Sequence, residues 1–390
     1  MSASILAGRK VCSRCIYDES LSGISFDESG VCNYCHQVDD LTRRFGTGHS
    51  DGIAKLTEII AEIKASGRTR KYDCVVGVSG GTDSSFLLAK AVEWGLRPIA
   101  VHYDNTWNSA VATQNIAKIT RSLGVDLFTY VVNNKEIDDI KRAFVLSGVA
   151  EFDTDTDLAF VQVIRTVAAR YGVKYILEGH SFVEEGVSPV GNNYFDGAYI
   201  ADIHNKFGRL RRKTYPLMTF FEYMKWIVIY RQKFIRPLWY MNYSKSAARA
   251  ELAEVHGWSD YGGHHLENRG SAFAHSIWIP QRYAIDYRIL TLAARVRAGR
   301  LNREVALAEY KLGPTVDPEL IQFVKKRLDL DDAQYSMAIS APRRSWKEFK
   351  TYKKRFERLR PLFYIFARAN LVPMSFYFKY CFPAKTIPTQ

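Results

Sequence analysis

One short stretch constrains the fold of this chain more than any other. Residues 75–85 read Val-Val-Gly-Val-Ser-Gly-Gly-Thr-Asp-Ser-Ser, and residues 86–94 continue with an amphipathic pattern typical of a helix. A buried strand, a tight glycine turn and a helix N-terminus form an anion site, because backbone N–H groups and the positive end of the helix dipole point to one spot. Gly80 and Gly81 let the main chain approach a phosphate closely, which a Cβ would prevent. The pattern predicts a phosphate-binding loop between a strand and a helix.

Other interpretations of this loop remain open from the residues alone. Serine and glycine fill many ordinary loops, and Thr82 or Asp83 would also serve as a helix cap. The Walker form of phosphate loop is excluded, since no Lys follows the second glycine. The complete string instead resembles the PP-loop of the ATP pyrophosphatase superfamily. That resemblance implies cleavage of ATP between its α and β phosphates, with pyrophosphate held by the loop.

Composition narrows the class of protein and of partner. Hydrophobic residues make up 47% and charged residues 24% of the 390 residues, which is ordinary for a soluble globular protein. The net charge of +13 calls for an anionic partner: a nucleotide, a nucleic acid or a membrane face. No secretion signal is evident, and the most apolar segment, residues 359–382, is interrupted by Arg360, Arg368 and Lys379. We expect a cytoplasmic protein without a transmembrane segment, with peripheral membrane contact left open.

Four of the six cysteines lie in two short motifs near the start of the chain. Cys12-x-x-Cys15 and Cys32-x-x-Cys35 are separated by sixteen residues, the spacing of a four-thiolate zinc site. Residues 24–30 are expected to form a small hairpin that brings the two motifs together. A redox or disulfide pair is the alternative. Four Cys ligands would leave no open position for catalysis, so we predict a structural zinc ribbon, folded around its metal.

The rest of the first half alternates between apolar strands and amphipathic helices. Strands are predicted over 72–78, 98–102, 126–132 and 174–177, and helices over 51–66, 110–123, 136–146 and 157–171. This alternation predicts an α/β fold with an open parallel sheet, whose ligands lie beyond the carboxyl ends of the strands. We predict three domains: a zinc ribbon over 1–50, a PP-loop domain over 51–235 and a mainly helical C-terminal region over 236–390.

Polar residues follow the predicted strands. Asp104 and Asn105 suit hydrogen bonds to ribose or adenine, although either is also a turn signal, and Trp107 would flank the base or simply pack. His180 would lie near the reacting phosphate or be an ordinary loop histidine. Asp157 follows two other aspartates that either cap a helix or contact substrate or Mg²⁺.

The second half contains one concentrated cluster and several basic segments. Residues 257–269 read Gly-Trp-Ser-Asp-Tyr-Gly-Gly-His-His-Leu-Glu-Asn-Arg, too rich in functional groups for a plain linker. The loop at 209–213 suits a second phosphorylated substrate or is a solvated face. Helices are expected within 220–239, over 244–256 and over 283–298, and the basic aromatic ending is expected to dock a partner rather than touch a membrane edge.

The ribbon, the Ser-Gly-Gly loop, Val101-His-Tyr-Asp104-Asn105 and the 258–269 cluster together resemble the N-acetyl sugar amidotransferase family, although His264 stands where that family has a Lys. The family is associated with acetamidino sugars of bacterial surface polysaccharides such as the lipopolysaccharide O-antigen. The resemblance implies ATP and Mg²⁺, a nucleotide-linked N-acetyl sugar, and adenylylation of the acetamide oxygen before ammonia adds. It implies catalytic roles for Asp83, Ser84, His180 and His265. It implies an ATP site at Ser79, Gly80, Gly81, Thr82, Asp83, Ser84, Asp104 and Asn105, and a substrate site at Asp157, Gly262, Gly263, Glu267 and Arg269.

The source of ammonia is a separate inference. A glutaminase needs a nucleophilic Cys, and here four cysteines are assigned to zinc while Cys74 lies in a predicted strand. Ammonia must come from solution or from another protein, and the resemblance implies a separate glutaminase with a cyclase-like channelling subunit, and no nucleic acid. The main alternative is a tRNA-modifying PP-loop enzyme of the thiolation type, for which only Cys74 and Cys381 remain as redox cysteines. A zinc-ribbon scaffold without catalysis is the non-enzymatic alternative.

Overall fold

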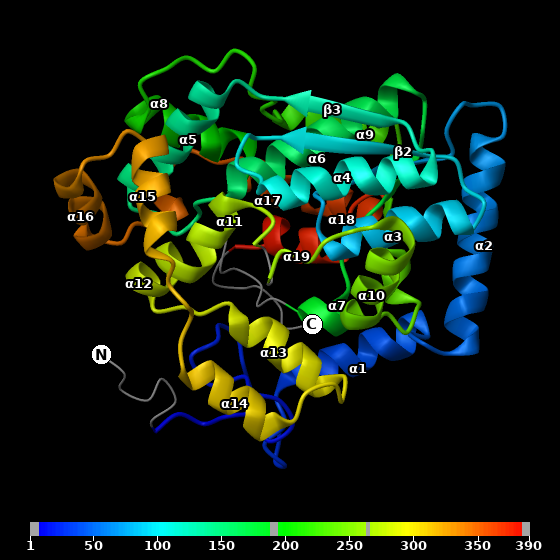
Figure 1. Cartoon of the computed structure of the whole chain (residues 1–390), viewed down its shortest axis with the longest axis horizontal. Helices are drawn as coiled ribbons and strands as arrows, with labels where there is room; N and C mark the ends of the chain where they lie inside the picture. Colours follow the sequence, from blue (N-terminus) through cyan, green and yellow to red (C-terminus); the bar gives the residue numbers. More distant parts are fainter. Residues whose placement is uncertain (1–7, 188–193, 263–265, 384–390) are drawn as a thin grey trace.

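A computed structural model of the chain describes residues 8–187, 194–262 and 266–383 (Figure 1). Within these ranges, no helix has the length and apolar character needed to cross a membrane. The centre of the fold is a five-stranded, wholly parallel sheet in the order β3-β2-β1-β4-β5. Its strands are β1 (Cys74–Gly77), β2 (Pro98–Asp104), β3 (Leu127–Val131), β4 (Tyr175–Leu177) and β5 (Lys233–Ile235).

The fifth strand differs from the sequence expectation. The helix expected within 220–239 forms as α9 (Phe220–Val228), but it is followed by a strand, β5, that the sequence analysis did not predict. All three residues of β5 are only half-buried, so they lack the continuous apolar run that marks the inner strands. Pairing with β4, in which Ile176 lies opposite Phe234, forms this strand.

Each face of the sheet is covered by helices, and the strand alternation divides the core accordingly. Val75 points into the core shared with α5 (Asn134–Ser147) and α6 (Thr154–Arg170). Cys74 and Val76 point the other way, toward α3 (Thr82–Glu93), α4 (Ala110–Leu123) and α10 (Lys245–His256). The chain therefore has the α/β architecture with an open parallel sheet that the sequence predicted.

The N-terminal four-cysteine region packs against later helices. It contains α1 (Asn33–Phe45), and α2 (Ser50–Gly67) then leads to the sheet. The expected hairpin at 24–30 is reduced to one antiparallel bridge between Phe26 and Cys32. The apolar residues of the four-cysteine region pack against α13 (Arg288–Arg297) and α14 (Arg303–Lys311). These two helices lie at the bottom of the molecule in Figure 1.

Most of the remaining segments are helical and share the core beside α5 and α6. They are α8 (Gly197–Phe207), α11 (Arg269–Phe273), η2 (Ala274–Trp278), α12 (Ile279–Tyr283), α15 (Pro318–Arg327), α16 (Asp332–Ser340), η3 (Trp346–Glu348), α17 (Lys353–Arg358), α18 (Arg360–Arg368) and α19 (Met374–Cys381). In contrast, α7 (Phe182–Glu185) packs against α13, and η1 (Pro237–Trp239) contributes Leu238 to the core on the other face of the sheet. The helix expected over 283–298 begins only at Arg288, because Ala284 adopts a left-handed conformation that ends α12.

The basic aromatic ending has an inner and an outer side. Phe363 is fully buried and stacks on Tyr223 of α9, with ring centroids 6.4 Å apart, whereas Ile365 is 60% exposed. The aromatic content of this segment therefore serves largely as core.

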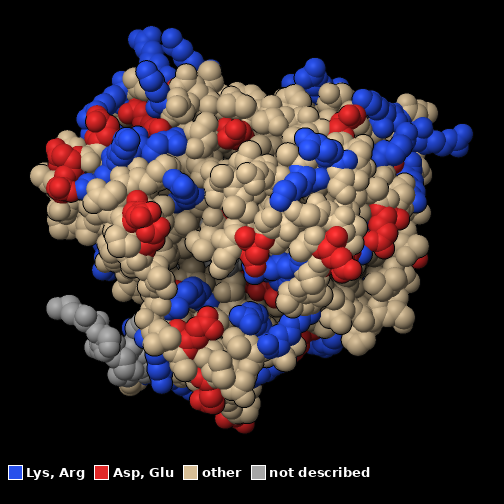
Figure 2. Space-filling model, in the orientation of Figure 1, with Lys and Arg blue, Asp and Glu red and all other residues tan. Residues whose placement is uncertain are grey.

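On the face drawn in Figure 2, Lys and Arg side chains are interspersed with Asp and Glu rather than gathered in one patch.

Candidate functional site

The Ser-Gly-Gly loop joins β1 to the N-terminus of α3, as its sequence predicted. Gly80 has a φ of 82°, and a Cβ added there would lie 2.2 Å from the carbonyl oxygen of Ala112 in α4. Its own carbonyl accepts hydrogen bonds from Trp258 Nε1 at 3.1 Å and from Asn115 Nδ2 at 3.3 Å. Backbone conformation and close packing thus both require glycine, and the loop is held in one shape.

Hydroxyl oxygens surround the N–H groups of this loop. Gly81 N donates to Ser79 Oγ at 3.2 Å, and Thr82 N donates to Tyr261 Oη at 3.3 Å. Ser84 Oγ lies 3.2 Å from Ser79 Oγ. A hydroxyl is an acceptor that a phosphate oxygen can replace, so the first turn of α3 has the donors and the dipole that an anion needs.

Asp83, in the first turn of α3, forms an ion pair that the sequence reasoning missed. Lys245 Nζ on α10 lies 2.6 Å from Asp83 Oδ2, Tyr243 donates to the other carboxylate oxygen, and Arg249 Nε lies 3.3 Å from Thr82 Oγ1. Burial disfavours the charge of Asp83, but Lys245 and the hydrogen bonds outweigh this and hold its pKa below the usual range. Lys245 and Arg249 are spaced i, i+4 on a predicted helix, a signal that could have identified them as a pair.

His180 follows β4 close to the same helix N-terminus. A Cβ on the preceding Gly179 would lie 2.9 Å from the backbone carbon of Asp83, which shows how closely this loop approaches α3. Trp239 Nε1 donates to His180 Nδ1 at 3.1 Å. Desolvation and the neighbouring charge of Arg236 lower the pKa of His180, so its imidazole is neutral at physiological pH, while its side chain is 40% exposed and its Nε2 lies 3.6 Å from Glu185 Oε2.

A cavity of about 310 Å³ opens beside the loop, at the carboxyl ends of β1 and β2. We call it the acidic cavity, because four carboxylate residues line it: Glu151, Asp153, Asp157 and Glu267. Among the described residues that line it, none is Lys or Arg. The other lining residues are Val78, Ser79, His102, Tyr103, Asn105, Asn108, Ala150, Phe152, Thr154, Thr156, Phe160, Asn268, Ser271, Ala274, His275, Ile279 and Tyr287.

Two clusters singled out in the sequence meet at this cavity. Ser109 N donates to the carbonyl of Glu267 at 2.8 Å, and Arg269 N donates to the carbonyl of Trp107 at 2.8 Å. Asn268 Nδ2 donates to Asn105 Oδ1 at 3.1 Å. Asn105 and Glu267 thus lie on one wall, with residues 267–269 running antiparallel to the loop after β2.

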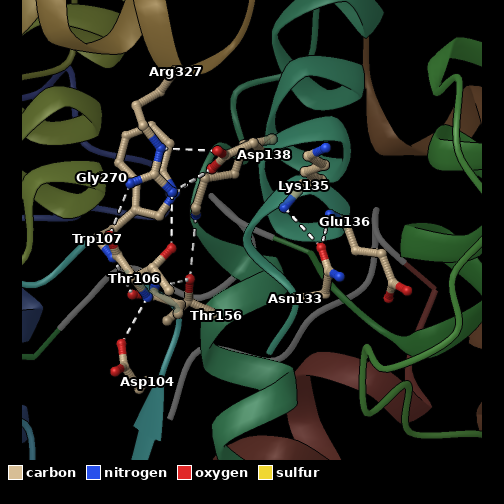
Figure 3. A network of polar contacts seen from close by, with 12 residues as sticks. Asp104, Thr106, Trp107, Asn133, Lys135, Glu136, Asp138, Thr156, Gly270 and Arg327 are labelled. Carbon is tan, nitrogen blue, oxygen red and sulfur yellow. Dashed lines mark hydrogen bonds and ion pairs between the residues drawn. The ribbon is translucent and has the colours of Figure 1, made fainter. Parts of the chain in front are cut away.

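The loop after β2 is anchored from behind (Figure 3). Trp107 is fully buried, and its Nε1 donates to Asp138 Oδ1 at 2.8 Å. Arg327 bridges Asp138 and the carbonyl of Thr106, with its guanidinium 4.8 Å from the centroid of the Trp107 ring. Trp107 therefore packs and does not flank a bound base, and Asp104 accepts a hydrogen bond from Thr106 N at 2.8 Å.

A buried lysine organises the rear wall. Lys141 of α5 is fully buried, with its Nζ 2.6 Å from Asp153 Oδ1 and 3.1 Å from Asp155 Oδ1. Burial disfavours the charge of Asp153, but Lys141 and hydrogen bonds hold its pKa below the usual range. Burial raises the pKa of Asp155 to about 6 despite the same ammonium group. Asp153 therefore faces the cavity as a carboxylate whose charge Lys141 already balances.

His102 also lines the cavity, although no role beyond its place in the 101–105 motif was predicted for it from the sequence. Its Nδ1 lies 3.0 Å from the carbonyl of Val78, and its Nε2 lies 3.2 Å from Asn108 Nδ2. Burial lowers its pKa, so it is a neutral imidazole that donates from Nδ1 and accepts at Nε2.

The predicted site residues fall into separate groups. Ser79, Asn105, Asp157 and Glu267 line the acidic cavity, whereas Asp83 and His180 lie beside the loop outside its lining. Arg269 stacks on Phe323, 4.4 Å from the ring centroid, and Gly262 N donates to Asp260. Gly263, His264 and His265 lie outside the described residues. In the loop at 209–213, Arg209 pairs with Asp329 and Arg212 contacts His204, away from the cavity lining.

The four N-terminal cysteines converge on one point. All are fully buried, and their sulfur atoms lie within 4.8 Å of one another, with three pairs 3.6–3.8 Å apart. A tetrahedron with metal–sulfur bonds of about 2.3 Å has edges of about 3.8 Å. Arg297 of α13 donates to the sulfurs of Cys35 and Cys15 at 3.3 and 3.2 Å. The geometry fits a tetrahedral metal ion and not a pair of disulfides, which need sulfurs about 2.0 Å apart.

Comparisons with known proteins address the family. Curated proteins give no match. An NMN synthetase from Francisella tularensis is 13% identical, with a TM-score of 0.35, over 72% of this chain and 93% of its own. An NH3-dependent NAD synthetase from Campylobacter jejuni subsp. jejuni NCTC 11168, solved with a nitrate ion, is 15% identical, with a TM-score of 0.30. The similarity covers 75% of this chain and 98% of the synthetase. Residues 267–360 match the family model described as "LPS biosynthesis protein WbpG-like, C-terminal domain". Over these residues the chain is similar to the C-terminal domain of WbpG-like LPS biosynthesis proteins, in keeping with the resemblance seen in the sequence.

Proposed function

We propose that this chain is an ATP-dependent amidotransferase that converts the N-acetyl group of a nucleotide-linked sugar into an acetamidino group, for the O-antigen or another surface polysaccharide. The observation that carries the proposal is the Ser-Gly-Gly loop at the N-terminus of α3, which directly adjoins the acidic cavity through Ser79. An anion site next to a polar cavity suits transfer between ATP and an uncharged acceptor. The match of residues 267–360 to the WbpG-like C-terminal domain supports the pathway.

The chemistry has two steps. The acetamide oxygen attacks the α phosphorus of ATP, pyrophosphate leaves, and the amide N–H proton is released. Ammonia then attacks the activated carbon and AMP leaves with the former acetamide oxygen. Since the amide is a poor electrophile and its oxygen a poor leaving group, adenylylation makes the second step feasible. The protein contributes mainly positioning and charge stabilisation.

The residues at the loop have separate roles in binding ATP. Ser79, Gly80, Gly81, Thr82 and Ser84 bind the β and γ phosphates through N–H and hydroxyl groups, as the loop geometry suggests. Lys245 and Arg249 add positive charge at the same helix end. Asp83 is the carboxylate at the loop that fits Mg²⁺, whose charge would neutralise the phosphates. His180 accepts from Trp239 at Nδ1, so its neutral ring carries the proton on Nε2 and is placed to donate a hydrogen bond near the reacting phosphate.

The four-cysteine cluster is proposed to hold a structural Zn²⁺. Cys12, Cys15, Cys32 and Cys35 fill all four positions of a tetrahedron, which leaves none for a substrate. Its role is to hold the N-terminal region against α13 and α14, the helices that Arg297 and Arg303 tie to it.

We propose that the nitrogen comes from a separate glutaminase through a cyclase-like subunit, in the cytoplasm. Cys74 and Cys381 are both fully buried, and neither lines the acidic cavity. Neither is therefore placed to act as a glutaminase nucleophile or as the sulfur carrier of a thiolation enzyme.

The proposal is tested by incubating the protein with ATP, Mg²⁺, ammonium and a panel of nucleotide-linked N-acetyl sugars. We expect AMP, pyrophosphate and an amidine product, identified by mass spectrometry. Asp83→Ala should abolish AMP release while the fold is retained, and Asp51→Ala, on the exposed side of α2, is the matched control. Full activity in Asp83→Ala would refute the site assignment, and AMP release without any amidine would refute the reaction.

A further inference from the structure

The charge of the acidic cavity is unusual for a site that receives a nucleotide sugar. Four carboxylate residues line about 310 Å³, and the described lining residues include no Lys or Arg. Lys141 balances Asp153 from behind, but it does not line the cavity. Since phosphate groups are bound by cationic side chains and N–H groups, this wall is unsuited to a diphosphate.

Other groups in the cavity are suited to an uncharged polar ring. The hydroxyls of Tyr103 and Thr154 are buried and have no hydrogen-bond partner among the described residues, and both residues line the cavity. Buried hydroxyls normally find partners, so these two indicate a polar ligand. Phe152 and Phe160 supply apolar faces, and Asn105 and Asn108 supply amides, the combination that binds polyhydroxylated rings.

One of the carboxylates lies directly beside the phosphate loop. A Cβ added at Gly81 would lie 3.4 Å from Glu267 Oε1, so this carboxylate approaches the loop closely. Asp157 lies in the first turn of α6 and also lines the cavity. A negative charge at the boundary between loop and cavity favours a cation at the point where an activated group and ATP would meet.

We propose that the acidic cavity holds the acetamido-bearing sugar ring, and that Asp157 and Glu267 stabilise the positive charge that forms as the amide becomes an amidinium. This inference rests on the proposed function and adds where the sugar lies, with its nucleotide outside the cavity. As ammonia adds to the adenylylated imidate, a C–N bond forms and the C–O bond to AMP breaks, with its electron pair leaving on AMP. The three hydrogens of ammonia become the three N–H hydrogens of the amidinium, one NH2 and one NH group. The amidinium then carries one positive charge, and the released AMP carries one more negative charge than it had in the adenylylated imidate.

The test uses a matched pair of neutral and cationic probes without ATP. N-acetylglucosamine and its acetamidino analogue differ only in the group that reacts, and calorimetry measures their binding to the full chain. A charge-assisted pair between carboxylate and amidinium should favour the cationic probe by about tenfold or more. Asp157→Asn and Glu267→Gln should each reduce this preference, whereas Glu254→Gln, an exposed residue of α10, should leave it unchanged.

The outcomes separate this inference from the proposed function. Equal binding of the two probes, or a preference that survives in both variants, would overturn the inference even if the protein makes amidines. A preference that both variants lose would support it, and a missing ATP-dependent reaction would then refute only the proposed function. A higher Mg²⁺ requirement in Glu267→Gln, with probe binding unchanged, would overturn the role given to Glu267.

Discussion

Replacing Lys245 with Met should destabilise the protein far more than an ordinary surface change. The Lys245 and Asp83 side chains are only 18% and 15% exposed, and their charged atoms lie 2.6 Å apart. Removing one partner of a buried pair costs about 3–5 kcal/mol, because the other charge is left uncompensated. Partial contact with water and the hydrogen bond from Tyr243 lower this to about 2–3 kcal/mol of unfolding free energy.

The matched control is Lys55→Met. Lys55 and Asp51 also form a Lys–Asp pair, at 3.2 Å, but their side chains are 44% and 58% exposed. Such a pair contributes about 0–1 kcal/mol. Urea unfolding followed by tryptophan fluorescence measures both variants, and equal losses in the two would refute the reasoning.

The loss of stability in Lys245→Met should depend on pH. The pKa of Asp83 is lowered in the folded protein, so its contribution is complete above the unfolded pKa of about 4 and is lost as the pH falls through the folded value. The difference between wild type and Lys245→Met should therefore be full at neutral pH and shrink in acid. A difference that grows toward low pH would contradict this sign.

Three further predictions concern the loop, the metal and the nitrogen source. Gly80→Ala should abolish pyrophosphate release, because its Cβ would lie 2.2 Å from the Ala112 carbonyl oxygen; wild-type release in a pyrophosphate assay would contradict this. Cys15→Ser should remove one equivalent of zinc in elemental analysis and lower the melting temperature, whereas Cys74→Ser should keep the metal; bound zinc at the wild-type level in the first variant would refute the cluster. With ammonium the isolated chain should form product and with glutamine it should not. Cys74→Ser and Cys381→Ser should both keep this activity, which would count against the thiolation alternative, and its loss in either variant would contradict the claim that these buried cysteines take no part in the reaction.

The sheet and the loop could be predicted because their signals are local. Val75, Val76 and Val78 with the following glycines specify a buried strand and a tight turn within a dozen residues. The position of Asn105 at the cavity also followed from the rule that ligands lie at the carboxyl ends of strands, whereas Glu267 reaches the same wall through long-range contacts.

The features that were missed depend on contacts between distant segments. Strand β5 exists because residues 233–235 pair with β4, not because they alternate or form an apolar run. Trp107 packs because Arg327, far along the chain, covers its ring. Lys245 reaches Asp83 across the fold, so its partner could not be read from spacing, although the i, i+4 spacing of Lys245 and Arg249 could have drawn attention to this helix face.

The central claim is that the acetamide oxygen of the sugar is adenylylated, and one isotope measurement tests it most directly. The substrate is labelled with the heavy oxygen isotope only in its acetyl oxygen and is incubated with the protein, ATP, Mg²⁺ and ammonium. Mass spectrometry then locates the label. We predict that it appears in AMP, in proportion to the amidine formed. Amidine formation with unlabelled AMP, or label recovered in pyrophosphate, would contradict the account.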